Sequence, residues 1–599
     1  MDHDPQLALV AVVSAALCVD RLLSVDPNLE QKTFAQGGTL IKRVGFVLLF
    51  FLVVPVFAGI PPVPKQKLPD RYQLLVKGVT VHKDGKKLQF DVAASRNVRY
   101  AYLSAGILPG ADAIAPIYRI NTAGFPDSDH FRLSLNLRTV RRFLTKKRTL
   151  LYYRIEVVGK KGHPESFESR VLLDREGNLL NTVVFGPYLD MPKGNEIVIS
   201  FELNTARSAA VIMDGKRILS DKPVKCHFVR FTGLKSGTHT YRIEGDPREF
   251  HFTIGDGAKI RFAMMCDSRQ GSGGAEYNLH GCNGEVIRKL FLSAWQHGVR
   301  FVLFPGDLVN GYTSKEDEFE MELKEWKYAT EPISAMIPVY VGMGNHEALI
   351  DMYRDNPWIF FDKKIPHSSE DVFGRVFVNP ENGDFVEKSG LPSYKENVYY
   401  FHRGNILFIM LNTNYWVGGD FPELQGGNLE GHIMDRQMKW LKKVLETEGK
   451  DAEHIIVSAH EPAFPVSAHM VDGMYYMGGN PTLNHGIDRS YVIKRRNELM
   501  TLLSRFGVQL IFFGDEHNYS RVLINKDIAP VTNDITQIIS GGTGAPFYEL
   551  AKNIPWRKNL KAFSRENHYI LVDVDEDIHV QVIGISGLVL DRFTIKKTD

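Results

Sequence analysis

The side chains of this 599-residue chain that could do chemistry follow short apolar runs. They carry carboxylate, amide and imidazole groups, which divalent and trivalent cations of hard to borderline character take as ligands. A carboxylate has two oxygens and can bridge two such cations. The residue types therefore predict a metal centre made from Asp267, Gly306-Asp307, Gly344-Asn345-His346-Glu347, His460 and Gly514-Asp515-Glu516-His517.

These clusters are spread from position 267 to position 517, which excludes a local ligand loop of the EF-hand kind. A single aspartate after a strand is more often a helix cap, but the whole set in this order favours a site that the fold assembles. Glycines beside Asp307, Asn345 and Asp515 are expected to allow the tight turns that direct these side chains inward.

The elements that would position the clusters are strands separated by helices. A helical pattern covers Gly284–His297. Such alternation predicts an α/β core, and ligands of these sheets bind beyond the carboxyl ends of the strands. The predicted strands are Arg261–Cys266, Phe301–Phe304, Ile337–Val341, Ile406–Leu411, His454–Ser458 and Leu510–Phe513.

The pattern Gly-Asp…Gly-Asn-His-Glu resembles that of calcineurin-like metallophosphoesterases, and more narrowly that of purple acid phosphatases and their bacterial relatives. The resemblance covers about residues 181–599 and includes the stretches Asn397–Phe401 and Ser540–Pro546. It implies an α/β/β/α metallophosphoesterase domain over residues 257–599. It also implies that the small domain before catalysis, residues 181–256, is of fibronectin type III kind.

The resemblance implies a role for each residue of the centre. Asp307 would bridge two metal ions, with iron, manganese, zinc and magnesium as the candidates. The first ion would be held by Asp267 and His517, and the second by Asn345, His460 and Asp515. A metal-bound hydroxide would attack phosphorus in line, and His346 would protonate the leaving oxygen or stabilise its charge.

The chain departs from the family pattern at three positions. Asp515 stands where the motif Gly-His-x-His has an imidazole, and its charge is expected to favour manganese, iron or magnesium over zinc. Arg269 replaces a usual second ligand, and it could either fork onto a substrate phosphate or pair with a carboxylate. Asn310 stands where purple acid phosphatases have a tyrosine, so we predict no tyrosinate–iron(III) colour, although Tyr312 follows. Arg269 and Asn310 are the candidate substrate-binding residues.

Loops near the predicted site supply further candidates. Residues 351–396 lack strand alternation and are expected to form an insertion over the mouth of the site. Substrate contact and ordinary loop packing are both open for Tyr353, Trp358 and His367. His469 and His485 could reach the leaving group or lie on the surface.

Two β-sandwich units of immunoglobulin or fibronectin III type are predicted ahead of the α/β core. Residues 65–180 form the first unit, with short strands separated by turn-like glycines. Residues 181–256 form the second, in which Thr232–Gly237 is a turn. The basic stretch Arg138–Arg148 in the first unit is expected to be a solvated crossover.

Composition sets the broad class of the protein. Hydrophobic residues make up 44 % and charged residues 24 %, which excludes a disordered, collagen-like or polytopic membrane protein. The net charge of +2 gives no sign of a nucleic-acid partner. Four cysteines are too few for a disulfide scaffold; Cys266 and Cys282 could pair, but free thiols are the expectation.

The first 58 residues are expected to be an extension plus a signal peptide. Lys42-Arg43 precede the apolar segment 44–60, which resembles a secretory signal cleaved near Ala58; a retained membrane anchor is the alternative. Because Asp2 and Asp4 are acidic, we expect translation to begin near Leu40. The protein would then be exported to the periplasm or beyond, and only this segment would touch the membrane.

The leading functional hypothesis is an exported, metal-dependent hydrolase of small phosphate monoesters. A phosphodiesterase or nucleotide hydrolase is the alternative within enzymes. An alternative of another class is a catalytically degenerate binding or adhesion protein, which the changes at Arg269 and Asp515 motivate.

Overall fold

The computed structural model describes residues 76–597, with gaps at 111–112, 114, 145, 160–163, 256, 258, 270–280, 312–315, 349–367, 388, 390, 416–430, 472 and 476–488. Residues 1–68 and 69–599 form separate units, and the account below concerns the second. The predicted signal segment, and residues Tyr312, Tyr353, Trp358, His367 and His485, lie outside the described residues. Within those residues, no helix has the length and apolar character needed to cross a bilayer.

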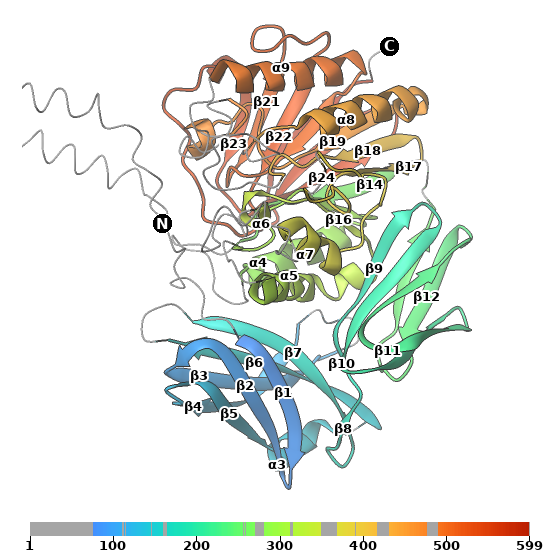
Figure 1. The fold of residues 1–599 in the computed structure, drawn as a ribbon, viewed down its shortest axis with the longest axis vertical. Helices are drawn as coiled ribbons and strands as arrows, with labels where there is room; N and C mark the ends of the chain where they lie inside the picture. Colours follow the sequence, from blue (N-terminus) through green and yellow to red (C-terminus); the bar gives the residue numbers. More distant parts are fainter. Residues whose placement is uncertain are drawn as a thin grey trace, which may run out of the picture. The chain divides into compact units, whose positions relative to one another are not determined.

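The first β-rich region consists of two antiparallel sheets, in the orders β1-β2-β5 and β4-β3-β6-β7-β8 (Figure 1). The apolar residues Leu88, Phe90 and Val92 of β2 point into a core to which both sheets contribute, whereas β7 is buried along almost its whole length. A short helix, α3 (Leu137–Val140), follows β5. The strands are β1 Val76–Asp84, β2 Lys87–Val98, β3 Tyr100–Ile107, β4 Ile117–Gly124, β5 Ser128–Asn136, β6 Arg148–Val158, β7 Glu165–Asp174 and β8 Leu179–Leu180.

The second β-rich region is one antiparallel sheet that bends along its longest strand. The first half of β10 pairs with β9 and the second half with β12, while β11 accompanies both halves. The pairing register shifts between Glu202 and Ala209, where the sheet bends. Assignment of the two regions to immunoglobulin or fibronectin III types stays a prediction. The strands are β9 Val183–Lys193, β10 Glu196–Met213, β11 Lys216–Phe231, β12 Gly237–Ile243 and β13 Phe250–Ile254.

The remaining chain forms two large mixed sheets, in the orders β16-β15-β14-β24-β25-β26 and β17-β18-β19-β20-β22-β21-β23. The strand runs and the helix expected from the sequence are confirmed at β14, β15, β16, β18, β19, β20 and α4. The strands are β14 Ile260–Met264, β15 Val302–Phe304, β16 Val339–Val341, β17 Tyr399–Arg403, β18 Ile406–Met410, β19 His454–Ser458, β20 Leu510–Phe513, β21 Tyr519–Ile524, β22 Ile535–Ser540, β23 Leu560–Ser564, β24 His568–Val574, β25 Ile578–Gly584 and β26 Val589–Ile595.

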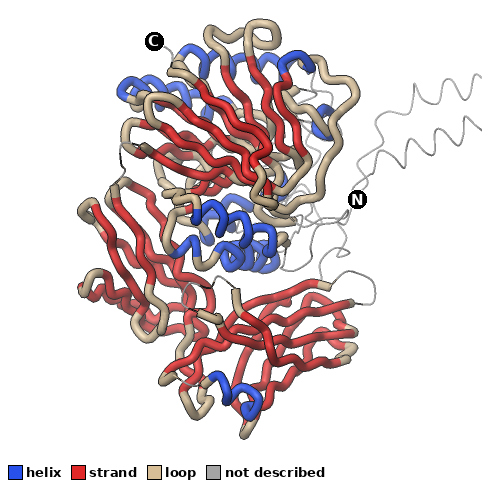
Figure 2. Tube along the Cα trace, turned by 180° about the vertical axis from the view of Figure 1, so that it is seen from behind, coloured by secondary structure: helices blue, strands red, loops and turns tan. Residues whose placement is uncertain are grey.

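Helices cover the outer face of each sheet, which gives four layers (Figures 1 and 2). One apolar cluster lies between the two sheets, a second lies between the first sheet and α4, α5 and α7, and a third lies under α8 and α9. Strands buried on both faces are continuous apolar runs, as β18 is. The helices are α4 Gly284–Gln296, α5 Glu316–Thr330, α6 Asn345–Ala348, α7 Ser369–Val376, α8 Asp435–Thr447 and α9 Arg489–Arg505.

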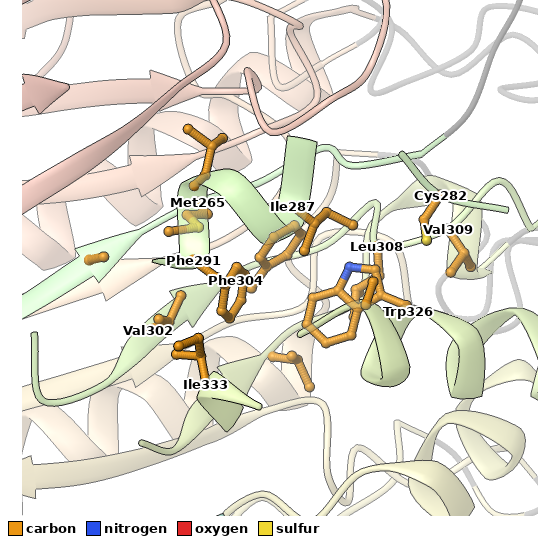
Figure 3. Close-up of a cluster of buried hydrophobic side chains, with 14 of the residues drawn as sticks. Met265, Cys282, Ile287, Phe291, Val302, Phe304, Leu308, Val309, Trp326 and Ile333 are labelled. Atoms are coloured by element: carbon orange, nitrogen blue, oxygen red, sulfur yellow. The ribbon is translucent and has the colours of Figure 1, made fainter. Parts of the chain in front are cut away.

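Part of the segment 351–396 that was expected to cover the site belongs to the core instead. Val372, Phe373 and Val376 of α7 join the buried cluster that contains Trp326 of α5. Figure 3 shows the Trp326 indole packed among apolar side chains of this cluster. The prediction of an insertion is therefore wrong for α7, because its apolar face packs against α5.

Candidate metal centre

The predicted ligands stand just beyond the carboxyl ends of neighbouring strands. Asp267 follows β14, Asp307 follows β15 and Asn345 begins α6 after β16, while His460 and Asp515 follow β19 and β20. Within each of the two sheets, the carboxyl ends of the parallel strands meet at one edge: Asp267, Asp307 and Asn345 follow strands of the first sheet, and His460 and Asp515 follow strands of the second. All five residues are buried.

Distances between side chains show that these residues converge. His517 Nε2 lies 3.7 Å from Asp267 Oδ1, and one ligand atom from each of Asp267, Asp307 and His517 falls within 4.8 Å of the others. His460 Nε2 lies 3.2 Å from Asp307 Oδ1 and 3.9 Å from Asp515 Oδ1. Asp307 is thus the carboxylate that neighbours both groups.

The three aspartates themselves take part in the turns that carry them, and Gly306 beside Asp307, with a φ of 139°, allows a turn as expected. Asp267, Asp307 and Asp515 have φ angles of 62°, 50° and 68°, which is the left-handed region. Gly344 and Gly514 act differently from the expectation, because they allow close packing rather than a turn. A Cβ at Gly344 would lie 2.2 Å from Asp307 Oδ1, and a Cβ at Gly514 would lie 2.2 Å from Cys266 Sγ.

Two buried glutamates of the motifs, to which the sequence gave no role, hold these loops. Glu347 accepts hydrogen bonds from the backbone N–H groups of Asp307 at 2.8 Å, Gly344 at 2.9 Å and Val309 at 3.1 Å. Glu516 accepts from the N–H groups of Val466 at 2.7 Å and Ser467 at 2.6 Å. The sequence signal for this supporting role is that Glu347 and Glu516 stand close to the ligand residues within their motifs.

His346 lies beside the bridging aspartate, with its ring held from behind. Its Nδ1 donates to the backbone carbonyl of Asn310 at 2.6 Å, and its Nε2 lies 3.7 Å from Asp307 Oδ2. This contact directs Nε2 into the site. The contact that Asn310 makes here uses its main chain, whereas the sequence had singled out its side chain for substrate.

Arg269 and two further residues flank the centre. Arg269 Nε lies 3.7 Å from Asp307 Oδ2, so the arginine pairs with a carboxylate, which was one of its two expected roles. Its Nη2 donates to the Tyr548 hydroxyl at 3.1 Å. Tyr548 stacks on the His517 ring at 4.1 Å. His469 Nδ1 lies 3.3 Å from Asp515 Oδ2. Sequence reasoning missed Tyr548, which follows the glycine-rich stretch ending at Pro546.

Cys266 is a neighbour of the centre that the sequence did not assign to it. Its thiol donates to the carbonyl of Gly306 at 3.1 Å, and Sγ lies 3.7 Å from His460 Nδ1. Cys266 and Cys282 are both free thiols, as expected. The thiol, Asp267 and His460 together offer three potential ligand atoms within 4.8 Å.

Burial and charge shift the proton affinities of these groups. Burial raises the pKa of Asp267 to about 7. Burial also works to raise the pKa of Asp307, but the imidazoles of His346 and His460 outweigh it and lower that pKa. Three carboxylates buried together are costly unless cations compensate them. The donor set of carboxylates, an amide and imidazoles therefore fits the metal ions that the sequence predicts.

Comparisons with known proteins agree with this geometry. Residues 279–519 match the family model described as calcineurin-like phosphoesterase. A nucleotide pyrophosphatase/phosphodiesterase from Hordeum vulgare is 25 % identical over 316 residues, which are 49 % of this chain and 70 % of that protein. The solved structure of a purple acid phosphatase from yellow lupin (Lupinus luteus) seeds has a TM-score of 0.52 at 16 % identity and covers 85 % of this chain and 93 % of its own. The structure of PhoD has a TM-score of 0.45 at 13 % identity, covering 69 % and 92 %.

The chain therefore carries a calcineurin-like phosphoesterase domain, and the protein is a phosphoesterase of the hydrolase class. A domain of this kind implies a dimetal centre.

Proposed function

We propose that the protein hydrolyses phosphate monoesters at a two-metal centre that Asp307 bridges. The observation that carries the proposal is the buried cluster at the strand ends, in which Asp307 neighbours His460, His346 and Arg269 at once. Asp267 and His517 would hold one cation; Asn345, His460 and Asp515 would hold the other. Bound there, the cations would supply Lewis acidity toward the phosphate and an activated water.

The side chains that hold no metal would handle the proton and the substrate charge. His346 keeps Nδ1 on the Asn310 carbonyl, so its Nε2 is directed at the leaving oxygen as a proton donor. Arg269 is buried beside Asp307 and would present its guanidinium to a phosphate oxygen. The two interpretations of Arg269 are compatible, because a guanidinium group has five N–H donors and can contact a carboxylate and a phosphate together.

A second candidate reaction is phosphodiester or nucleotide hydrolysis. The relative from Hordeum vulgare, which is named a nucleotide pyrophosphatase/phosphodiesterase, favours it. A catalytically degenerate binding protein is the weakest alternative, because the departures at Arg269 and Asp515 leave five residues of the pattern in place: Asp307, Asn345, His346, His460 and His517. The metals are proposed among iron, manganese, magnesium and zinc, with the Asp515 carboxylate favouring the first three.

The test uses the full chain, stripped of metal and reloaded with single metals. We expect turnover of an aryl phosphate to exceed that of a bis-aryl phosphate. Asp307→Asn and His346→Ala should each lower kcat/KM at least 100-fold, while His402→Ala, at an exposed histidine, should leave it unchanged. Equal activity in all three variants would refute the site. Preference for the diester would select the second candidate.

We also propose that the protein is exported. The support is the apolar segment 44–60 after Lys42-Arg43. Sequencing the N-terminus of the mature protein should find it near Gly59; recovery of the whole activity in the cytoplasm with residue 44 onward intact would contradict export.

A further inference from the structure

The basic stretch Arg138–Arg148, which the phosphoesterase site does not use, is part of a larger charged surface. It contains six cationic side chains and no acidic one. It connects β5 to β6 at one end of the first β-rich region, where Figure 1 labels α3. Its six cations are all exposed.

Contacts bring other turns to the same end of the sheets. The N–H of Leu137 donates to the carbonyl of Lys86 at 2.8 Å, which ties α3 to the β1–β2 turn. Lys83 Nζ donates to the carbonyl of Glu176 at 3.2 Å, which ties β1 to the β7–β8 turn. Arg142 Nη2 donates to the carbonyl of Arg119 on β4 at 3.5 Å.

We call these residues the basic end. Its cations are Lys83, Lys86, Lys87, Arg119, Arg138, Arg141, Arg142, Lys146, Lys147, Arg148 and Arg175, and its acids are Asp84, Asp174 and Glu176. Eleven cations and three acids give +8, whereas the whole chain carries only +2. The positive charge of the protein is therefore concentrated here.

The basic end is not neutralised from within the protein. Among the described residues, no ion pair within 4.0 Å joins any of its eleven cations to a carboxylate. Its long side chains instead hydrogen-bond backbone carbonyls, as Arg148 does to Gly245 at 2.8 Å. Like charges crowded on one surface repel one another. Because no ion pair offsets this repulsion, an anionic partner would reduce it.

We propose that the basic end docks on an anionic lipid bilayer. The cations come from turns at the tip of a sandwich, which suits a flat surface. Single-stranded nucleic-acid sites interleave cations with exposed aromatic rings, but the aromatic ring of this stretch, Phe143, is half-buried and covered by the Arg142 guanidinium at 4.9 Å. Near an anionic leaflet, each additional Lys or Arg adds to the electrostatic attraction.

The sequence ahead of this region supplies a second argument. Only residues 61–75 separate the apolar segment 44–60 from β1. Fully extended, these residues span about 50 Å at most. This linker joins β1 at Val76, at the end of the strand away from the basic end, and the strand is about 30 Å long. Because the extended linker is longer than this, a membrane-bound form or precursor would still hold the basic end within reach of the bilayer surface, where a weak electrostatic contact becomes effective.

The test compares charge variants of the full chain by sedimentation with vesicles of phosphatidylcholine alone or with about 30 % phosphatidylglycerol. The basic-end variant replaces Arg141, Arg142, Lys146 and Lys147 by Gln. The matched control replaces four exposed cations of α8, Arg436, Lys439, Lys442 and Lys443, by Gln. Both variants keep the apolar segment and lose the same charge.

We expect the wild type and the α8 variant to bind the anionic vesicles at least ten-fold more tightly than the neutral ones. The basic-end variant should lose this ten-fold gain. In 0.5 M salt, where the screening length is on the order of 4 Å, the wild type and the α8 variant should lose it too. Unchanged kcat/KM on a soluble aryl phosphate would show that the basic-end variant is folded. The proposal would be wrong if both variants lost vesicle binding equally, or if the wild type showed no preference for the anionic vesicles. It would also be wrong if the wild type bound DNA or polyphosphate but not the anionic vesicles.

Discussion

The three aspartates of the candidate centre adopt a backbone conformation that L-residues avoid. A left-handed φ at a non-glycine residue costs on the order of 1–3 kcal/mol, and it persists only where the surroundings enforce it. Here the surroundings do so through the main chain: the N–H of Asp307 donates to Glu347 and the N–H of Asp515 donates to Asp267 Oδ1 at 3.0 Å. The strained backbone directs the three carboxylates toward the same place.

Close packing at Gly344 leads to a prediction at the same scale. Gly344→Ala would place a methyl group 2.2 Å from Asp307 Oδ1 and 2.6 Å from its backbone nitrogen. Because backbone cannot yield cheaply, we expect Asp307 to shift and both kcat/KM and bound metal to fall at least ten-fold. Metal analysis and steady-state kinetics measure the two effects. Gly194→Ala, at an exposed glycine with open space around it, is the matched control.

The residues of the centre differ in how far the sequence could predict them. Asp267, Asp307 and His460 could be predicted because each directly follows an apolar strand, and strand ends converge by topology. Cys266 and Tyr548 could not, because their contacts depend on how separate loops fold over one another. The main-chain role of Asn310 leaves no trace in its side chain.

At the scale of elements, helix α5 braces two loops of the centre. Glu322 accepts a hydrogen bond from the N–H of Gly311 at 2.8 Å, next to the Asn310 carbonyl that orients His346. Trp326 Nε1 donates to Ser268 Oγ at 2.9 Å, next to Asp267. The helix was not predicted, because its buried face carries Glu318, Glu322 and Glu325, which interrupt the apolar pattern of a buried helix face.

Replacing Trp326 should separate packing from loop support. Trp326→Phe keeps most of the ring contacts with Phe304 and Phe291 but loses the bond to Ser268. We expect a loss of about 1–2 kcal/mol in stability and a lowered kcat/KM. Trp326→Ala should cost about 3–5 kcal/mol because it leaves a cavity. Urea unfolding and kinetics on both variants test this; full activity in Trp326→Phe would show that the bond to Ser268 does not support the site.

A second element-scale prediction concerns pH. Burial raises the pKa of Glu396, which accepts a hydrogen bond from the N–H of Asn379, to about 8. An unfolded glutamate has a pKa of about 4.3, so the stabilising contribution of the protonated form is present below about pH 4 and is lost as the pH rises to about 8. Glu396→Gln cannot ionise. Between pH 5 and pH 8, the unfolding free energy of the wild type should therefore fall by about 3 kcal/mol relative to that of Glu396→Gln.

Urea unfolding at the two pH values measures this difference. Glu446→Gln, at an exposed glutamate of α8, should follow the wild type at both. A constant offset between Glu396→Gln and the wild type would mean that Glu396 is ionised in the folded protein throughout this range.

At the scale of the whole molecule, the β-rich regions and the phosphoesterase domain meet at one buried carboxylate. Glu331, directly after α5, binds Arg170 Nη1 of β7 at 2.7 Å and lies 3.4 Å from Arg248 Nη1, just before β13. The same two guanidinium groups donate to the carbonyl of Gly186 in β9, at 2.6 Å and 2.9 Å. Such a junction could not be predicted from sequence, because its members are far apart along the chain.

Removal of this carboxylate should destabilise the protein as a whole. In Glu331→Gln, Arg170 stays buried without its counter-charge, and breaking a buried pair by removing one partner costs about 3–5 kcal/mol. Glu244→Gln breaks the exposed pair with Arg217, which should cost less than about 1 kcal/mol. Urea unfolding followed by tryptophan fluorescence measures both. Because Arg170 and Arg248 come from different β-rich regions, we expect the Glu331→Gln transition to split into separate steps; a single transition at the wild-type midpoint would show that the regions hold together without this carboxylate.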